Sequence, residues 1–199
     1  WPETDGVRCN AMGVLGDALG SNGRSEEGLP VYEALLALIR RNWSHNENLV
    51  LSAQTNLASC LNNLGRYDEA LVLKREVYAR TVAVLGKDSE EAVSDCLNVA
   101  ETLRKLRRFA EAATLARDQL PSARSLGNGH ELVILLSRVL ADSLCQNPDS
   151  SRDDVLEAIS ILQQALEQAR RTFGATHPRT RETEAKLGSA RHRAREFAY

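Results

Sequence analysis

The sequence lacks long apolar runs, an excess of charge of one sign, and all but a few aromatic residues. No stretch approaches the roughly 18 consecutive apolar residues that a membrane-spanning helix requires, so membrane insertion is not expected. The formal net charge of −2 argues against the strongly basic balance of a dedicated nucleic-acid binder. Aromatic residues make up only 5% of the chain, and the dominance of leucine and alanine favours helix packing over sheets.

The amino end shows neither a signal peptide nor an initiator methionine. Residues 1–5 read Trp-Pro-Glu-Thr-Asp, a polar and acidic start with no apolar core behind it. We therefore interpret the chain as a processed protein or as a piece of a longer one.

Paired cysteines are also missing. The four cysteines lie at non-equivalent places in the repeat described below and form no C-x-x-C motif; they are Cys9, Cys60, Cys96 and Cys145. We interpret them as small buried apolar residues rather than as metal or redox ligands. This pattern predicts a reducing, cytoplasmic setting, with no metal and no cofactor.

Catalytic signatures are absent from the sequence. No H-E-x-x-H, G-x-S-x-G or G-x-x-x-x-G-K-[ST] motif occurs. His45, His130 and His177 fall at expected helix junctions, and His192 stands apart from them. Acid pairs such as those at residues 90–91 lie at expected helix starts, where they complement the helix dipole. We expect neither an enzyme nor a small-molecule substrate.

One segment of the chain recurs 42 residues further on. Residues 56–70 return as residues 98–112, and the same residue type stands at Asn56/Asn98, Ala58/Ala100, Leu61/Leu103, Leu64/Leu106, Arg66/Arg108, Glu69/Glu111 and Ala70/Ala112. A weaker copy lies 42 residues earlier, at Leu15, Leu19, Gly23, Arg24 and Glu27. A fixed period of this length is typical of stacked supersecondary units.

Apolar residues at helical spacing, separated by turn-forming segments, predict nine helices and no strands. The expected helix pairs cover residues 6–43, 48–86, 89–127 and 130–174, and a terminal helix covers residues 178–197. The predicted fold class is an all-α, right-handed solenoid of about four helical hairpins plus a terminal helix. We expect a single array over residues 1–199.

Prolines and glycines modify the prediction for some of these helices. Pro30 is expected either to kink the second helix or to start it, and Pro121 to bend or interrupt the sixth. In the first helix, the spacing of Gly13, Gly16 and Gly20 would let a neighbouring helix approach closely.

The repeat resembles the tetratricopeptide repeat, and within that family the kinesin light chain type. Small residues occupy the two positions at which paired helices touch in that family: Gly16 and Gly28, Ala58 and Ala70, Ala100 and Ala112, and Ala141 and Ala158. The period of 42, the segment Asn56-Leu57-Ala58 and the turn Gly174-x-x-His177-Pro178 match the kinesin light chain type. The resemblance covers residues 6–196. It implies a non-catalytic module that binds a protein or peptide partner in a concave groove. Because the heptad coiled coil is absent, we expect a kinesin-light-chain-like repeat protein rather than a kinesin light chain.

The resemblance also implies where a partner would bind, since the first helix of each pair lines the groove. Asparagine side chains such as Asn56 and Asn98 grip peptide backbones in that family, and an amide both donates and accepts hydrogen bonds. The outer repeats carry Val14, Val139 and Lys186 instead, so binding is expected around the central repeats. The expected partner-binding residues are Asn56, Asn63, Asn98, Glu101, Arg104, Lys105, Arg138 and Asp142. Their positions within the repeat add four further candidates, Asn10, Asp17, Ser52 and Ser59. The alternative is that these are ordinary solvated helix residues.

Other interpretations stay open at this point. A clamp for a C-terminal carboxylate would use Arg104, Lys105 and Arg138, but Asn10 and Gly13 stand where the resembled clamp needs a lysine. The basic terminal helix could contact acidic protein or nucleic acid, or simply cap the array. The chain could also be a regulatory region of an enzyme whose catalytic domain lies elsewhere.

A structural role is a further alternative. In it, the chain is a subunit of a large assembly and docks through its ends and convex face. Exposed apolar residues at the edges, such as Trp1, Trp43 and Phe197, would favour that role. The position of exposed apolar area, in the groove or at the ends, distinguishes the two hypotheses.

Overall fold

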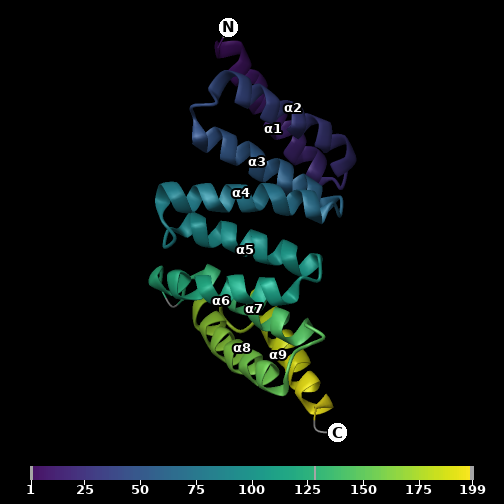
Figure 1. The fold of residues 1–199 in the computed structure, drawn as a ribbon, viewed down its shortest axis with the longest axis vertical. Coiled ribbons are helices and arrows are strands. Elements are labelled where there is room, and N and C mark those ends of the chain that lie inside the picture. The colour runs from purple at the N-terminus through teal and green to yellow at the C-terminus, as the bar shows by residue number, and fades with distance from the viewer. Residues whose placement is uncertain (1, 128, 198–199) are drawn as a thin grey trace. The chain divides into compact units, whose positions relative to one another are not determined.

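The computed structural model describes residues 2–127 and 129–197, and every regular element in these residues is an α-helix (Figure 1). The helices are α1 Pro2–Ser21, α2 Ser25–Trp43, α3 Glu47–Asn63, α4 Tyr67–Leu85, α5 Glu90–Lys105, α6 Phe109–Ser125, α7 Glu131–Gln146, α8 Arg152–Phe173 and α9 Pro178–Glu196. The predicted all-α fold class is confirmed. Within the described residues no helix is long and apolar enough to cross a membrane.

Two prolines lie inside helices without ending them. α2 begins at Ser25, so the alternative in which Pro30 starts this helix is wrong. α6 likewise continues through Pro121 to Ser125 and is not interrupted there. A proline removes one hydrogen bond of the helix ladder. Both helices persist because they bury an apolar face, which includes Leu35 in α2 and Leu120 in α6.

The chain divides into two compact units, Trp1–Val77 and Tyr78–Tyr199, and the boundary lies within α4. In the first unit α1 packs on α2, and α2 packs on α3. Leucine and isoleucine residues of α2 meet the apolar face of α3 in one core. Its buried members are Tyr32, Leu35, Leu36, Ile39, Val50, Ala53, Leu57, Cys60, Leu61 and Ala70.

The second unit is built around α7, which contacts α5, α6, α8 and α9. Nearly every residue of α7 from Val133 to Leu144 is buried, including polar ones. Leu136 and Leu140 of α7 lie in one core with Leu162 of α8 and Leu187 of α9. The helix with the most neighbouring helices is therefore buried along most of its length.

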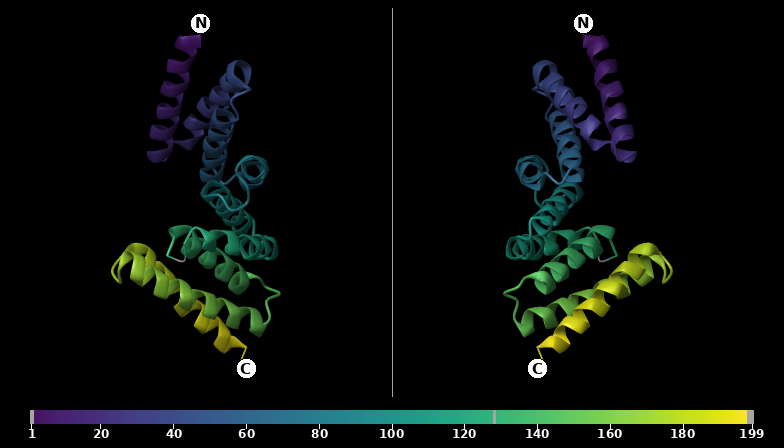
Figure 2. Two further views of the ribbon diagram at one scale, coloured as in Figure 1. Left: turned by 90° about the vertical axis from the view of Figure 1, so that its left-hand side faces the viewer. Right: turned by 90° about the vertical axis from the view of Figure 1, so that its right-hand side faces the viewer.

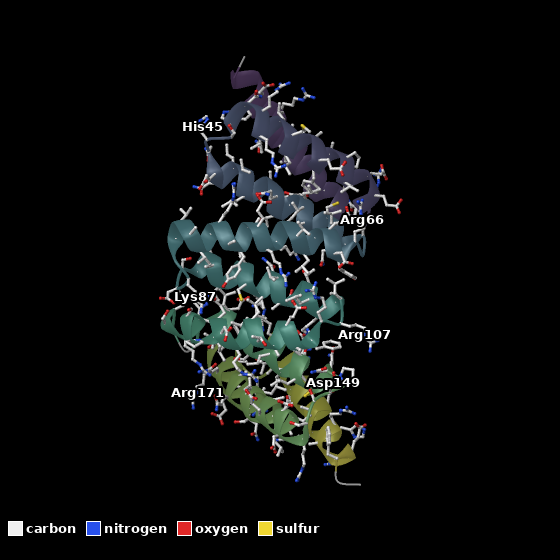
Figure 3. All side chains as sticks on the ribbon, viewed as in Figure 1. His45, Arg66, Lys87, Arg107, Asp149 and Arg171 are labelled. Carbon is white, nitrogen blue, oxygen red and sulfur yellow. The ribbon has the colours of Figure 1, made fainter. Side chains whose placement is uncertain are left out.

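The turns inside the first three hairpins repeat one backbone geometry at the 42-residue period. Gly23, Gly65 and Arg107 adopt left-handed φ values of 73°, 74° and 59°. The backbone N–H of the next residue donates to a carbonyl five residues back, as Arg66 does to Leu61 over 2.9 Å. This bond satisfies one carbonyl that the end of the helix would otherwise leave unpaired. Figure 3 shows the side chain of Arg107 projecting outward from its turn.

An arginine–glutamate pair follows each of these turns. Arg24 binds Glu27, Arg66 binds Glu69 and Arg108 binds Glu111, each through two hydrogen bonds of 2.6–2.7 Å. The arginine bonds hold the pKa values of Glu27 and Glu69 below their usual range. Exposed pairs of this kind contribute little to stability individually. They mark the same helix start in each repeat.

Candidate partner-binding groove

A groove of about 500 Å³ lies in the first unit between α1 and α3, with α2 as its floor. α1 contributes Gly6, Cys9, Asn10, Gly13, Val14 and Asp17. α2 contributes Leu35, Ile39 and Trp43, and α3 contributes Leu49, Ser52, Ala53 and Asn56. The groove thus has an apolar floor and a rim that combines polar side chains with the exposed Val14 and Leu49.

The groove is open because α1 carries glycines on the side that faces it. A Cβ atom added at Gly6 or at Gly13 would meet nothing within 4 Å, so no neighbouring helix fills this space. The expected close approach of a neighbour holds only for Gly16, where an added Cβ would lie 2.6 Å from the ring of Tyr32. Gly20, like Gly13, faces open space.

Tyr32 fixes α1 on α2 beside the groove. Its ring lies against Gly16, and its hydroxyl donates a 2.6 Å hydrogen bond to the carboxylate of Asp17. Burial, together with this bond to Asp17, raises the pKa of Tyr32 above its ordinary value. One carboxylate oxygen of the rim is therefore held in place by the floor helix.

The rim combines side chains from both first helices. Asn10 and Asp17 stand on α1, and Ser52 and Asn56 stand on α3. Within the described part of the chain, the side-chain amides of Asn10 and Asn56 have no hydrogen-bond partner. They can both donate to and accept from a bound backbone. The structure brings these four residues together along one groove, and their role as partner contacts stays a prediction. The floor residues of α2 were not predicted as part of a site.

Several residues of the second unit that were expected to contact a partner lie close together, but their side chains form ion pairs within the protein. Arg104 of α5 contacts Asp142 of α7 with 3.1 Å between Nη2 and Oδ2. Lys186 of α9 donates to the same oxygen of Asp142, and Arg138 of α7 pairs with Glu182 of α9. This ion-pair network joins α5, α7 and α9.

Burial of this ion-pair network carries a desolvation cost, which the pairing of the charges offsets. The side chains of Arg138 and Asp142 are only 9% and 10% exposed. Buried charges are tolerated when each is paired, and removing one partner leaves an uncompensated charge. The Nε atoms of Arg104 and Arg138 are buried and have no hydrogen-bond partner within the described residues. Arg104, Arg138 and Asp142 therefore hold helices together and are less available to a partner than their types imply.

The other expected contacts are more dispersed. Asn63 is the exposed last residue of α3 and borders a shallow polar pocket with Arg24 and Leu64. On α5, Asn98 is half-buried, while Glu101 and Lys105 are exposed. These residues stay predictions as partner contacts.

The aromatic residues expected at exposed edges behave differently from one another. Trp43 is partly buried and forms part of the groove floor. Phe197 is 37% exposed and lies under the guanidinium of Arg193, 5.3 Å from the ring centre. Trp1 lies outside the described residues.

Residues 49–125 match the family model of the tetratricopeptide repeat. This segment, 77 of the 199 residues, is therefore similar to the tetratricopeptide repeat. The paired small positions of this repeat are fully buried, at 0% exposure for Ala58, Ala70, Ala100, Ala112, Ala141 and Ala158. Helices touch at these points because no larger side chain separates them.

Solved structures share the tetratricopeptide fold with this chain. A Podosopora anserina protein with nearly identical TPR-like repeats, described as a kinesin light chain, superposes with a TM-score of 0.78 at 20% identity. The match covers 95% of this chain and 88% of that one. BtubC (BKLC) from P. vanneervenii gives a TM-score of 0.79 at 20% identity, over 99% of this chain and 77% of that one. Among curated proteins, no sequence matches significantly. The fold is thus that of kinesin-light-chain-like repeat arrays.

Proposed function

We propose that this chain is a non-catalytic protein-interaction module that binds a segment of a partner protein in the groove between α1 and α3. Tetratricopeptide repeats generally mediate protein–protein interactions. The observation that carries the proposal is the groove itself. Its volume of about 500 Å³ and its apolar floor under a few polar groups are typical of sites that enclose a ligand.

The chemistry of the groove suits a peptide segment with apolar side chains. Leu35, Ile39 and Trp43 offer an apolar floor on which such side chains would be buried. The amides of Asn10 and Asn56 stand on opposite helices, where they would pair with the backbone N–H and C=O groups of the segment. Because the helices are already formed, capture would cost little ordering of the receptor.

α5 carries a separate set of candidate contacts in the second unit. Asn98, Glu101 and Lys105 lie on this helix and are at least partly exposed, so they remain candidate contacts for a partner protein. Arg104, Arg138 and Asp142 would contribute mainly by holding α5, α7 and α9 in position. The proposed setting is the cytoplasm, as the cysteine pattern predicts.

Filling the groove tests the proposal. A partner peptide would first be selected from a displayed random library on the immobilised parent chain. Gly13→Leu places a side chain in the open space between α1 and α3, and we expect it to weaken binding of that peptide at least about tenfold. Asn56→Ala should weaken it about fivefold, through loss of one backbone hydrogen bond. Titration calorimetry measures both.

The matched control is Gly188→Leu in α9. Gly188 also lies inside a helix, and its added Cβ would likewise meet nothing within 4 Å. This variant should bind the peptide as the parent does, and circular dichroism should show equal helicity for all variants. Unchanged binding by a folded Gly13→Leu variant would overturn the groove as the site.

A further inference from the structure

Among the described residues that line the groove between α1 and α3, Asp17 is the only charged one. Tyr32 donates a 2.6 Å hydrogen bond to its Oδ1 atom. Its Oδ2 atom has no hydrogen-bond or ion-pair partner within the described part of the chain, and the side chain is exposed. The groove therefore presents a fixed negative charge with one oxygen available to a ligand.

The second unit holds a carboxylate at the same position of the repeat, and there it binds cations. Asp17 and Asp142 each directly follow the small residue at which the paired helices touch. Asp142 accepts a hydrogen bond from Lys186 of α9 and pairs with Arg104 of α5. In this chain a carboxylate at that position therefore binds lysine and arginine side chains.

The first unit lacks the lysine that completes this arrangement. Asn56 of α3 occupies the repeat position of Lys186, and it lines the same groove as Asp17. Its neutral amide can donate a hydrogen bond but brings no positive charge. The unit around the groove is acidic as well, since residues 1–77 contain ten acidic and seven basic side chains. A cation that pairs with Asp17 would thus have to come from a bound partner.

The groove has an apolar end and a charged end. α1 and α3 run in the same direction, and α2 runs the opposite way (Figure 2). Asn42 of α2 donates a 2.8 Å hydrogen bond to Asp5, so the adjacent Trp43 lies beside the start of α1. Tyr32, eleven residues earlier than Trp43 in α2, bonds instead to Asp17. Trp43 and Asp17 therefore mark opposite ends, separated by about 16 Å at roughly 1.5 Å per helical residue.

This length defines the segment that the groove can hold. An extended segment covers about 16 Å with about five residues, at roughly 3.3 Å per residue. On such a segment, every second side chain points to the same side. A large apolar side chain that packs on Trp43 and Ile39 would then stand about four residues from the side chain that reaches Asp17. An acidic side chain at that point would meet a like charge and no cation.

We propose that the groove selects a basic and apolar segment, in which a lysine or arginine of the partner pairs with Oδ2 of Asp17 while a large apolar side chain packs on Trp43 and Ile39. The inference rests on the proposed function, because it names the kind of segment that the same groove takes. Tyr32 holds Oδ1 and so leaves Oδ2 to the partner. The charge of Asp17 favours basic segments and rejects acidic ones.

Selection from a displayed random peptide library on the immobilised parent and on Asp17→Asn tests this selectivity. Peptides selected on the parent should be enriched in lysine and arginine and depleted in aspartate and glutamate, relative to the unselected library. Selection on Asp17→Asn should lose this enrichment. The asparagine oxygen can still accept the hydrogen bond of Tyr32, so the variant removes the charge and keeps the anchor of α1 on α2.

Titration calorimetry with one parent-selected peptide measures the pairing directly. Asp17→Asn should bind this peptide about three- to tenfold more weakly than the parent does, and the difference should shrink as the salt concentration rises. Replacing the basic residue of the peptide by alanine should cost the parent a similar factor and cost Asp17→Asn little more, because the two groups form one pair.

The matched control is Glu33→Gln. Glu33 is an exposed acidic residue of α2 in the same unit, and it does not line the groove. This variant also removes one negative charge, and it should bind the peptide within about twofold of the parent because its charge is screened at a distance. Equal weakening by Glu33→Gln and by Asp17→Asn would indicate a general charge effect and overturn the assignment to Asp17.

Gly13→Leu separates this inference from the proposed function. Suppose that Gly13→Leu abolishes binding of the selected peptides, but that they carry no excess of basic residues or bind Asp17→Asn as tightly as the parent. The groove is then the site, and the inference about Asp17 is wrong. If instead a folded Gly13→Leu variant binds these peptides unchanged, the groove is not the site and both proposals are wrong.

Discussion

At the scale of single residues, Arg107 shows how a repeat tolerates an ill-suited side chain. It takes the left-handed conformation that Gly23 and Gly65 take at the equivalent positions, and it is exposed. A side chain with a Cβ is strained there, whereas glycine is not. The helix end nevertheless forms because Arg108 donates its backbone hydrogen bond to Leu103.

We therefore predict that Arg107→Gly stabilises the protein by about 1 kcal/mol. The reciprocal change Gly65→Arg should destabilise it by a similar amount, since it introduces the same strain in another turn of the same geometry. Urea unfolding followed by circular dichroism measures both. A loss of stability in Arg107→Gly would show that the arginine side chain contributes a contact larger than the strain.

At the scale of helices, two glycines in similar helical positions should respond in opposite ways to alanine. At Gly16 an added Cβ would lie 2.6 Å from the Tyr32 ring, which is only 5% exposed and bound to Asp17. The ring cannot yield without losing that bond, so we expect Gly16→Ala to cost about 1–3 kcal/mol.

Gly28 is the internal control for this prediction. Its added Cβ would meet Leu19, Gly16 and Cys60 at 3.6–3.9 Å, which is ordinary contact. It occupies the position held by alanine in the later repeats, and alanine favours a helix by about 1 kcal/mol over glycine. Gly28→Ala should therefore raise the free energy of unfolding. Equal effects of the two changes in thermal or urea unfolding would refute the packing argument.

Most of the helices could be predicted from the sequence. Which side chains of different helices come together to form a site could not. Leu57 and Leu61 recur with Ala58 at a fixed period, and Gly65 ends the helix, so local signals suffice to place α3. The alternative in which Pro30 starts α2 was wrong for a physical reason. The local preference of proline for a helix start competes with the burial of Leu35 and its neighbours, and burial decides where the helix begins.

The candidate site depends on contacts that no local signal contains. Trp43 looks the same in sequence whether it faces solvent or forms the floor of a groove. Arg104, Asp142 and Lys186 come from three helices about 40 residues apart, so their mutual pairing appears only in the packed structure. Residue type suggested that they were available to a partner, and the fold uses them internally.

At the scale of the whole molecule, stability should follow the number of neighbours that each helix has. α7 packs on α5, α6, α8 and α9, and the Asp142 network ties it further to α5 and α9. α1 packs on α2, carries Gly6, Gly13 and Gly20 with open space beside them, and leaves Val7 and Val14 exposed. In repeat architectures each unit is stabilised mainly by its direct neighbours. Local opening should therefore begin at α1 and reach α7 last.

Hydrogen exchange followed by mass spectrometry would measure this order. We expect amides of α7 to be protected at least about a hundredfold more than those of α1, because α7 opens only with the second unit while α1 opens alone. If α1 exchanged as slowly as α7, the number of neighbouring helices would not govern local stability in this fold.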